Sequence, residues 1–329
     1  MKLEAAITGR AWVTPLGSDL AAVSAQIDAG VPGEIELVQD PLAKRPLRLM
    51  RVPSGLVAEV SRLPRLRRSS AISLYAVEAA LRAVEMAGSA VGRTAVIVAV
   101  SSASVVYTHR FYRRIVEEGA RGASPALFPE TVHNAPASHV AAALGIDGAS
   151  YTLVGDGTVG FSALHMAAGL LRMDEADRCV VVGAEEVDVI TAEAYRTWRF
   201  GGVYSEGAGA VVLERAGGLK ITTHPGTPFT TRTAAAAALD NVLDVMEAEP
   251  DLVVYGASAG EIGRLEQREL AARGLLGVSL RQSLGDALGA ASLFQIIQAV
   301  NRLDSGKRAL VCGLGINLQA GAAALYAES

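Results

Sequence analysis

The turn at residues 155–160, Gly-Asp-Gly-Thr-Val-Gly, lies where a nucleophile would be expected. The segment Tyr151–Met173 begins with an apolar strand pattern, passes through this turn and continues with apolar residues at helical spacing. Such strand–turn–helix elbows often place a nucleophile at a helix N-terminus, where the helix dipole favours a thiolate. No cysteine or serine stands in the turn. The segment therefore predicts a scaffold for nucleophilic catalysis that lacks its nucleophile.

The other reactive side chains give no alternative centre. Cys179 and Cys312 each lie in an apolar run, which indicates buried, reduced thiols rather than a disulfide framework. No two histidines have the spacing of a metal site with an acidic partner, and each is expected to be structural or solvated. We therefore expect neither a metal nor a cofactor. The histidines are His109, His133, His139, His165 and His224.

The composition favours a large apolar core and argues against nucleic-acid binding. Of the 329 residues, 50% are hydrophobic and only 5% aromatic, which suits helices packed tightly on sheets. A net charge of −4 and a pI of about 5.8 differ from the basic excess of nucleic-acid-binding proteins. No stretch approaches the roughly 18 uninterrupted apolar residues that a membrane span needs. Because Glu4 lies where a signal peptide would be apolar, we expect a cytoplasmic protein.

Strand and helix patterns alternate along the chain in two similar stretches. In the first, a helical pattern over 70–88 precedes a buried strand over 94–102, the elbow, and strands over 179–187 and 206–217. The second stretch repeats this alternation, with elements expected over 219–224, 232–249, 251–258, 261–274, 277–283, 287–303, 308–317 and 321–328.

Both stretches end in a glycine-rich pair of strands. The alternation predicts an α/β protein with mixed sheets covered by helices, built from two similar halves at 1–216 and 217–329. Two proline- and glycine-rich segments, 30–64 and 117–139, are expected to be irregular.

Five blocks, in order, resemble β-ketoacyl-acyl-carrier-protein synthases. They are the opening strand and turn (7–20), the elbow with its flanking strands (134–187), a glycine-rich strand (204–214), a helix-opening block (283–300) and a closing gate loop (312–325). The resemblance spans almost the whole chain. It implies the thiolase-like fold, with α-β-α-β-α layers and an internal duplication, in agreement with the two similar halves.

The resemblance also shows which catalytic groups are missing. In that family the elbow carries a cysteine that takes the acyl chain, and two histidines assist decarboxylation and stabilise the enolate. The cysteine position falls on Gly157, and the histidine positions fall on Gly256 and Asp286. The position of the family's lysine falls near Arg281. Neighbouring residues supply no cysteine or imidazole, so we expect no catalytic triad.

An inactive sister of the ketosynthase is known in type II polyketide systems as the chain-length factor, and this chain resembles it. The resemblance implies a heterodimer with an active ketosynthase, in which bulky side chains of the sister limit the length of the acyl tunnel. Core packing is the other interpretation for each such side chain. The tunnel candidates are Val106, Phe111, Tyr112 and Phe128.

A basic run precedes the helical pattern at 70–88. Acyl carrier proteins are acidic, so this run is a candidate docking surface, although a solvated helix start fits it equally well. The arginines are Arg62, Arg65, Arg67 and Arg68.

Two departures and two alternatives accompany this interpretation. Many chain-length factors carry glutamine at the cysteine position, where this chain has Gly157. The family also usually has a longer loop before residue 203 than this chain has. The first alternative is an enzyme with relocated chemistry, using Asp156, Asp286 or Ser258, since a carboxylate in a dry pocket can act as a base. The second is a homodimeric ketosynthase-like protein that only binds acyl chains or carrier protein.

Overall fold

The computed structural model describes residues 1–39, 45–89, 92–197, 202–231, 233–256 and 258–328. Its main sheet contains two sets of five strands and the short strand β10 (Thr227–Pro228), which pairs with β14. The first set is β1 (Leu3–Val13), β4 (Thr94–Val100), β5 (Ser150–Val154), β6 (Arg178–Glu185) and β8 (Gly207–Glu214). The second set is β9 (Leu219–Thr223), β11 (Leu252–Tyr255), β12 (Val278–Ser279), β13 (Arg308–Leu314) and β14 (Gln319–Tyr326).

The strand order repeats between the two sets. The first runs β1-β8-β6-β4-β5 and the second runs β9-β14-β13-β11-β12. In each set the first two pairings are antiparallel and the last two are parallel. Antiparallel pairing of β1 with β9 joins the two sets. This repeat is the internal duplication expected from the sequence, while the boundary between 1–216 and 217–329 stays a prediction.

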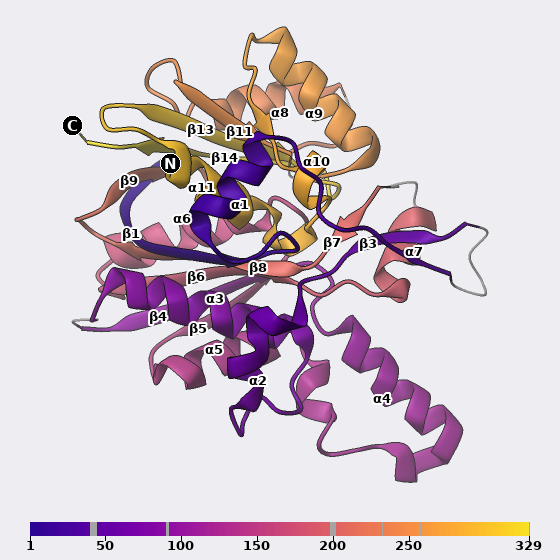
Figure 1. Cartoon of the computed structure of the whole chain (residues 1–329). Helices are drawn as coiled ribbons and strands as arrows, with labels where there is room; N and C mark the ends of the chain where they lie inside the picture. The colour runs from indigo at the N-terminus through magenta and orange to yellow at the C-terminus, as the bar shows by residue number, and fades with distance from the viewer. Residues whose placement is uncertain (40–44, 90–91, 198–201, 232, 257, 329) are drawn as a thin grey trace.

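The helices form three layers around the two strand sets (Figure 1). The outer layer on the first set contains α3 (Ala71–Ala87) and α5 (Ala135–Leu144), and the one on the second set contains α8 (Ala234–Leu243) and α9 (Gly260–Ala272). Between the sets lie α6 (Val159–Arg172) and α11 (Ala291–Arg302), which contact each other. The predicted thiolase-like α-β-α-β-α layering is confirmed.

The apolar pattern of each helix fixes its layer. All ten residues from Ala291 to Val300 in α11 are buried, since a helix in the central layer is covered on every side. By contrast, α3 buries one face, including Ile72 and Ala76, and exposes residues such as Glu85. The elbow helix α6 packs beside α11, so the turn that precedes it lies against the second half of the chain.

The structure corrects two predicted elements in the second half of the chain. The strand expected over 277–283 is wrong for most of its length, because α10 (Arg281–Leu284) follows the two-residue strand β12. Leu280 and Leu284, four residues apart, are both buried, so the helical spacing suits the packing here. The helix expected over 232–249 already ends at Leu243.

The segments expected to be irregular contain short elements. Residues 30–64 hold β2 (Glu36–Val38), β3 (Leu47–Met50), η1 (Ser54–Val57) and α2 (Ala58–Arg62). With β7 (Tyr204–Ser205), the first two form a separate small sheet. Residues 117–139 hold η2 (Gly119–Gly122), η3 (Phe128–Thr131) and the start of α5. The remaining elements are α1 (Leu20–Asp28), α7 (Val189–Thr197) and η4 (Leu288–Ala290).

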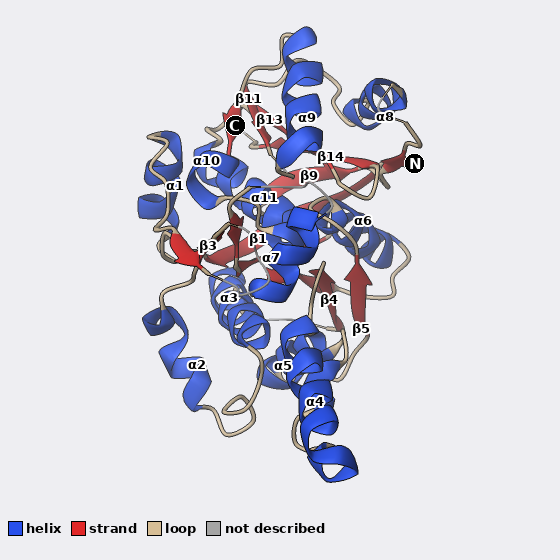
Figure 2. Ribbon diagram, turned by 90° about the vertical axis from the view of Figure 1, so that its right-hand side faces the viewer, coloured by secondary structure: helices blue, strands red, loops and turns tan. Residues whose placement is uncertain are grey.

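Helix α4 (Val105–Glu118) projects from the body of the molecule (Figures 1 and 2). Val106 is its only buried residue, and the helix packs on η2 and η3. Because so few residues of α4 are packed against the rest of the protein, apolar side chains of this helix are exposed to solvent. No helix in the described ranges has both the length and the apolar character needed to cross a membrane.

Candidate functional site

The elbow between β5 and α6 is built around Asp156. Its Oδ1 accepts hydrogen bonds from the backbone N–H of Thr158 at 2.9 Å and from the Thr158 hydroxyl at 2.7 Å. This contact satisfies one of the N–H groups that a helix leaves free at its first turn. Gly157, at the predicted cysteine position, is buried, and its carbonyl accepts from Ser292 Oγ at 2.9 Å. The elbow therefore has the expected geometry but carries no side chain at its apex.

The second oxygen of Asp156 binds the loop between β13 and β14, which corresponds to the predicted gate loop. Oδ2 accepts from the backbone N–H of Asn317 at 2.6 Å. A Cβ placed on Gly315 would lie 2.1 Å from the same oxygen, so only glycine permits this approach. Asp156 is buried and both its oxygens are in use. It serves here to join the elbow to the gate loop.

Gly256, at the predicted position of the first histidine, directly follows β11. Its φ of +107° lies in a region that L-residues rarely adopt, and a Cβ there would lie 2.9 Å from Ser279 Oγ. An imidazole would therefore require a different backbone path at this point.

Asp286, at the predicted position of the second histidine, has a buried carboxylate. Oδ2 accepts from the backbone N–H of Ala259 at 2.7 Å, and Oδ1 accepts from that of Leu288 at 3.1 Å. Burial raises the pKa of Asp286, against the opposing effect of these two hydrogen bonds. Its own backbone pairs with Val203 and Ser205. Asp286 thus joins three loops at the position predicted for the second histidine.

Arg281, near the lysine position, turns its charge into the protein. Its Nη1 donates to the Ser258 carbonyl at 2.9 Å, and its Nη2 donates to the Gly263 carbonyl at 3.2 Å. The guanidinium also forms an ion pair with the fully buried Glu266 at 3.5 Å. This cation is used for structure around the start of α9.

The residues at the three predicted triad positions, two glycines and an aspartate, offer no thiol or imidazole for acyl transfer. Both cysteines are buried, and burial raises their pKa values, to about 12 for Cys179, so neither is a ready thiolate. In the described part of the chain, no group of three or more His, Cys, Asp and Glu residues could hold a metal ion. The structure brings Asp156, Asp286 and Ser258 to the same region, all buried.

Comparison with known proteins agrees with this geometry. The family described as "Beta-ketoacyl synthase, N-terminal domain" matches residues 58–217, which include the elbow. The match to the β-ketoacyl synthase family covers this region, just under half of the chain. No curated protein matches the sequence significantly.

Solved ketosynthase structures have the same fold as this chain. The ishigamide ketosynthase/chain length factor has a TM-score of 0.84 at 21% identity, covering 99% of this chain and 100% of that chain. A type II polyketide acyl-carrier protein in complex with its ketosynthase has a TM-score of 0.78 at 12% sequence identity, and the match covers 99% of each chain. A β-ketoacyl synthase from Burkholderia phymatum STM815 has a TM-score of 0.76 at 17% sequence identity, and the match covers 100% of each chain. At these identities the likeness establishes the ketosynthase fold.

Three of the four tunnel candidates in this ketosynthase-fold chain lie together. The ring of Phe111 lies 5.7 Å from that of Tyr112 and 5.8 Å from that of Phe128. Tyr112 and Phe128 are 61% and 57% exposed, whereas Val106 is buried inside the chain's own core. The role of all four in lining a tunnel stays a prediction.

The apolar surface extends beyond the residues that the sequence indicated. Val116 on α4 is 84% exposed, and Val132, Tyr151 and Val154 are also exposed. Val132 directly follows η3, and Tyr151 and Val154 lie on β5. Helix α4 packs on η3, and α5 contacts both η3 and β5, so it connects these elements. Strand β5 is the last strand of its sheet. We call these exposed residues, with Tyr112 and Phe128, the apolar face.

The four arginines of the basic run are exposed at the end of α2 and in the turn after it. Arg62 forms an ion pair with Glu59, while Arg65, Arg67 and Arg68 have no ion pair within the described ranges. Beside them is a pocket of about 410 Å³ between this turn and α5. It is lined by Leu63, Pro64, Arg65, Leu66, His139, Ala142 and Ala143.

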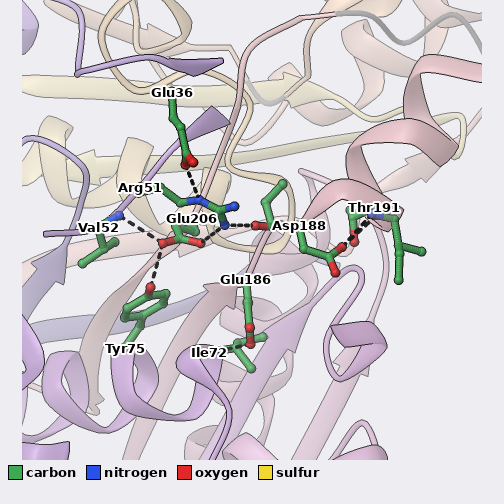
Figure 3. Close-up of polar contacts among 11 residues, drawn as sticks. Glu36, Arg51, Val52, Ile72, Tyr75, Glu186, Asp188, Thr191 and Glu206 are labelled. Atoms are coloured by element: carbon green, nitrogen blue, oxygen red, sulfur yellow. Dashed lines mark hydrogen bonds and ion pairs between the residues drawn. The ribbon is translucent and has the colours of Figure 1, made fainter. Parts of the chain in front are cut away.

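A buried polar cluster, which the sequence did not single out, surrounds Glu206 (Figure 3). Glu206 lies in the glycine-rich block and accepts from the Tyr75 hydroxyl at 2.7 Å and from the backbone N–H of Val52 at 3.1 Å. Arg51 pairs with it at 3.1 Å. Nearby, Glu186 accepts from the backbone N–H of Ile72 at 3.3 Å. This cluster joins β3, α3 and the end of β6.

A second buried carboxylate holds the segment 101–103 that precedes α4. Glu185 is fully buried and accepts from the backbone N–H groups of Ser101, Ser102, Ala103 and Gly289. Burial raises its pKa to about 7, and the four hydrogen bonds oppose this effect. Glu185 and Glu206 lie in two of the blocks that resemble the ketosynthase family, 134–187 and 204–214, but no feature of the sequence marks either glutamate.

Proposed function

We propose that this chain is a non-catalytic chain-length-factor subunit. It pairs with an active ketosynthase and shapes the acyl tunnel during type II polyketide or polyene chain elongation. The observation that carries the proposal is the set of residues at the three triad positions: Gly157, Gly256 and Asp286. Condensation needs a thiolate and groups that stabilise a developing anion, and two glycines and a buried carboxylate supply neither.

The apolar face supports pairing with a second subunit. The residues of this face lie along α4, η3 and β5, which α5 connects, and β5 is an edge strand of the sheet. Partner subunits in obligate complexes commonly cover such exposed apolar surfaces with large apolar interfaces. In the proposed heterodimer, Phe111, Tyr112 and Phe128 face the ketosynthase's acyl chain and limit its length by their volume. Val106 is the fourth residue proposed for the tunnel, although its side chain is buried in this chain.

The basic run supports docking of an acyl carrier protein. Arg65, Arg67 and Arg68 present positive charge beside a mainly apolar pocket, which suits an acidic partner with an apolar residue on its surface. Replacing Arg65 and Arg68 by glutamate should weaken carrier binding about tenfold or more at low salt and remove its salt dependence. Binding that is unchanged in both respects would contradict this role.

The proposal is tested by co-expressing the chain with an active ketosynthase from the same biosynthetic system. We expect a 1:1 complex by size-exclusion chromatography with native mass spectrometry, and elongation by the complex but not by this chain alone. Turnover by the isolated chain would favour relocated chemistry at Asp156, Asp286 or Ser258. A homodimer that ignores the ketosynthase would favour a protein that only binds acyl chains or carrier protein.

A further inference from the structure

The turn η3 carries Phe128, one of the tunnel candidates, yet it has little structure of its own. It is four residues long, and its position therefore depends on contacts with other elements. The Phe128 ring reaches Phe111 on α4 but is 57% exposed, so ring packing alone does not fix it. The position of the Phe128 ring therefore depends on the contacts that hold η3 in place.

Glu130 is the principal anchor of η3. It is 6% exposed, and a buried carboxylate requires partners. Oε2 accepts from the backbone N–H of Ser70 at 3.0 Å and from its hydroxyl at 3.2 Å. His139 Nε2 donates to Oε1 at 2.6 Å. Burial alone would raise the pKa of Glu130, but the hydrogen bonds from His139 and Ser70 outweigh it and hold the pKa below its ordinary value.

These contacts place η3 between two helices of the rigid scaffold. Ser70 precedes the first turn of α3, where the helix dipole favours a negative charge. His139 lies on α5. The next residue, Thr131, accepts at its carbonyl from Ser104 Oγ and Thr108 Oγ1 of the α4 region, at 2.9 and 3.1 Å. Glu130 thus connects the turn to α3 and α5, and Thr131 connects it to α4.

We infer that Glu130 is a positioning residue that fixes Phe128 in the proposed tunnel and thereby limits product length. This inference rests on the proposed function. Without the Glu130 carboxylate, η3 keeps its attachment to α4 but loses its attachment to α3 and α5. Phe128 then gains freedom to move away from the acyl chain, and longer chains are accommodated.

The test uses the heterodimer with its ketosynthase and measures the distribution of product lengths. We compare Glu130→Ala, Phe128→Ala and the double variant, with Glu130→Gln as a milder change that keeps one acceptor oxygen. Glu78→Gln is the matched control, because Glu78 is a similarly buried carboxylate on α3 that pairs with Arg82. Glu130→Ala should raise the share of longer products at least threefold, Glu130→Gln less, and Glu78→Gln not at all.

The double variant distinguishes positioning from general destabilisation. If Glu130 acts through Phe128, the double variant gives the product distribution of Phe128→Ala alone. An additive effect, or unchanged products in both Glu130 variants while Phe128→Ala lengthens them, would overturn the inference and leave the proposed function standing. If Phe128→Ala also has no effect, or no complex forms, the proposed function fails with it.

Discussion

Asp156 accepts a hydrogen bond from the backbone N–H of Asn317 at 2.6 Å, across 161 residues of sequence. The same carboxylate holds the first turn of α6 through Thr158. One side chain beside the empty nucleophile position therefore connects the elbow to the gate loop. In this chain the region predicted to correspond to the catalytic elbow holds loops together.

Asp156→Ala should lower the free energy of unfolding by ~2–3 kcal/mol, because it leaves buried N–H groups at Thr158 and Asn317 without an acceptor. Hydrogen exchange at residues 315–318 should accelerate more than exchange in β13. Urea unfolding and exchange mass spectrometry provide the measurements. Asp147→Ala, at an exposed carboxylate, is the control and should change stability by no more than about 0.5 kcal/mol. Equal effects of the two variants would refute this role.

Restoring a histidine at position 256 should damage the fold rather than rebuild a site. Gly256→His places a side chain at φ +107° and close to Ser279 Oγ, which should cost ~1–3 kcal/mol of stability. Gly55→His is the control, because a Cβ there meets nothing within 4 Å. Thermal and urea unfolding of both variants provide the comparison. A Gly256→His variant as stable as the parent would show that the loop accepts an imidazole after all.

Glu186 should make stability depend on pH. Burial raises its pKa from 4.5 to about 7, so between these values the folded chain keeps a proton that the unfolded chain releases. Stability contributed by the protonated form is thus present below pH 4.5 and is lost as the pH rises toward 7, by at most ~3 kcal/mol. Glu186→Gln removes this dependence.

Because Glu185 titrates in the same window, the measurement is the difference between parent and Glu186→Gln in urea unfolding at pH 5 and pH 7.5. The parent should lose more stability over this interval than the variant. Parallel profiles would mean that Glu186 keeps an ordinary pKa.

The sequence predicted the elements whose signals are local. The helix expected over 70–88 is α3, and the strand over 94–102 is β4, because apolar spacing alone defines both. The glycine turn at 155–160 also has the elbow geometry that its composition indicated. The fold class followed from the alternation of such elements.

The contacts that close the site could not be predicted in this way. Asp156 meets Asn317 only after the two halves pack against each other, and Asp286 meets Ala259 only after the second half has folded. Likewise, the strand expected over 277–283 failed because Leu280 and Leu284 pack into the core with helical spacing. No local pattern encodes such pairings.

Val116 should be an energetically important residue of the proposed subunit interface. It is 84% exposed on α4, so Val116→Glu should leave the isolated chain as stable as the parent. In the heterodimer the glutamate would be buried without a partner, and affinity for the ketosynthase should fall at least tenfold. Leu276→Glu, at an exposed leucine in the other half, is the control. Equal affinity for both variants would remove α4 from the interface.

The most direct test of the central claim is intact-mass analysis of the heterodimer after incubation with an acyl thioester donor. We predict an acyl adduct on the ketosynthase subunit and an unchanged mass for this chain, because Gly157 offers no atom to acylate. An acyl adduct on this chain that is chased into elongated product would contradict the account.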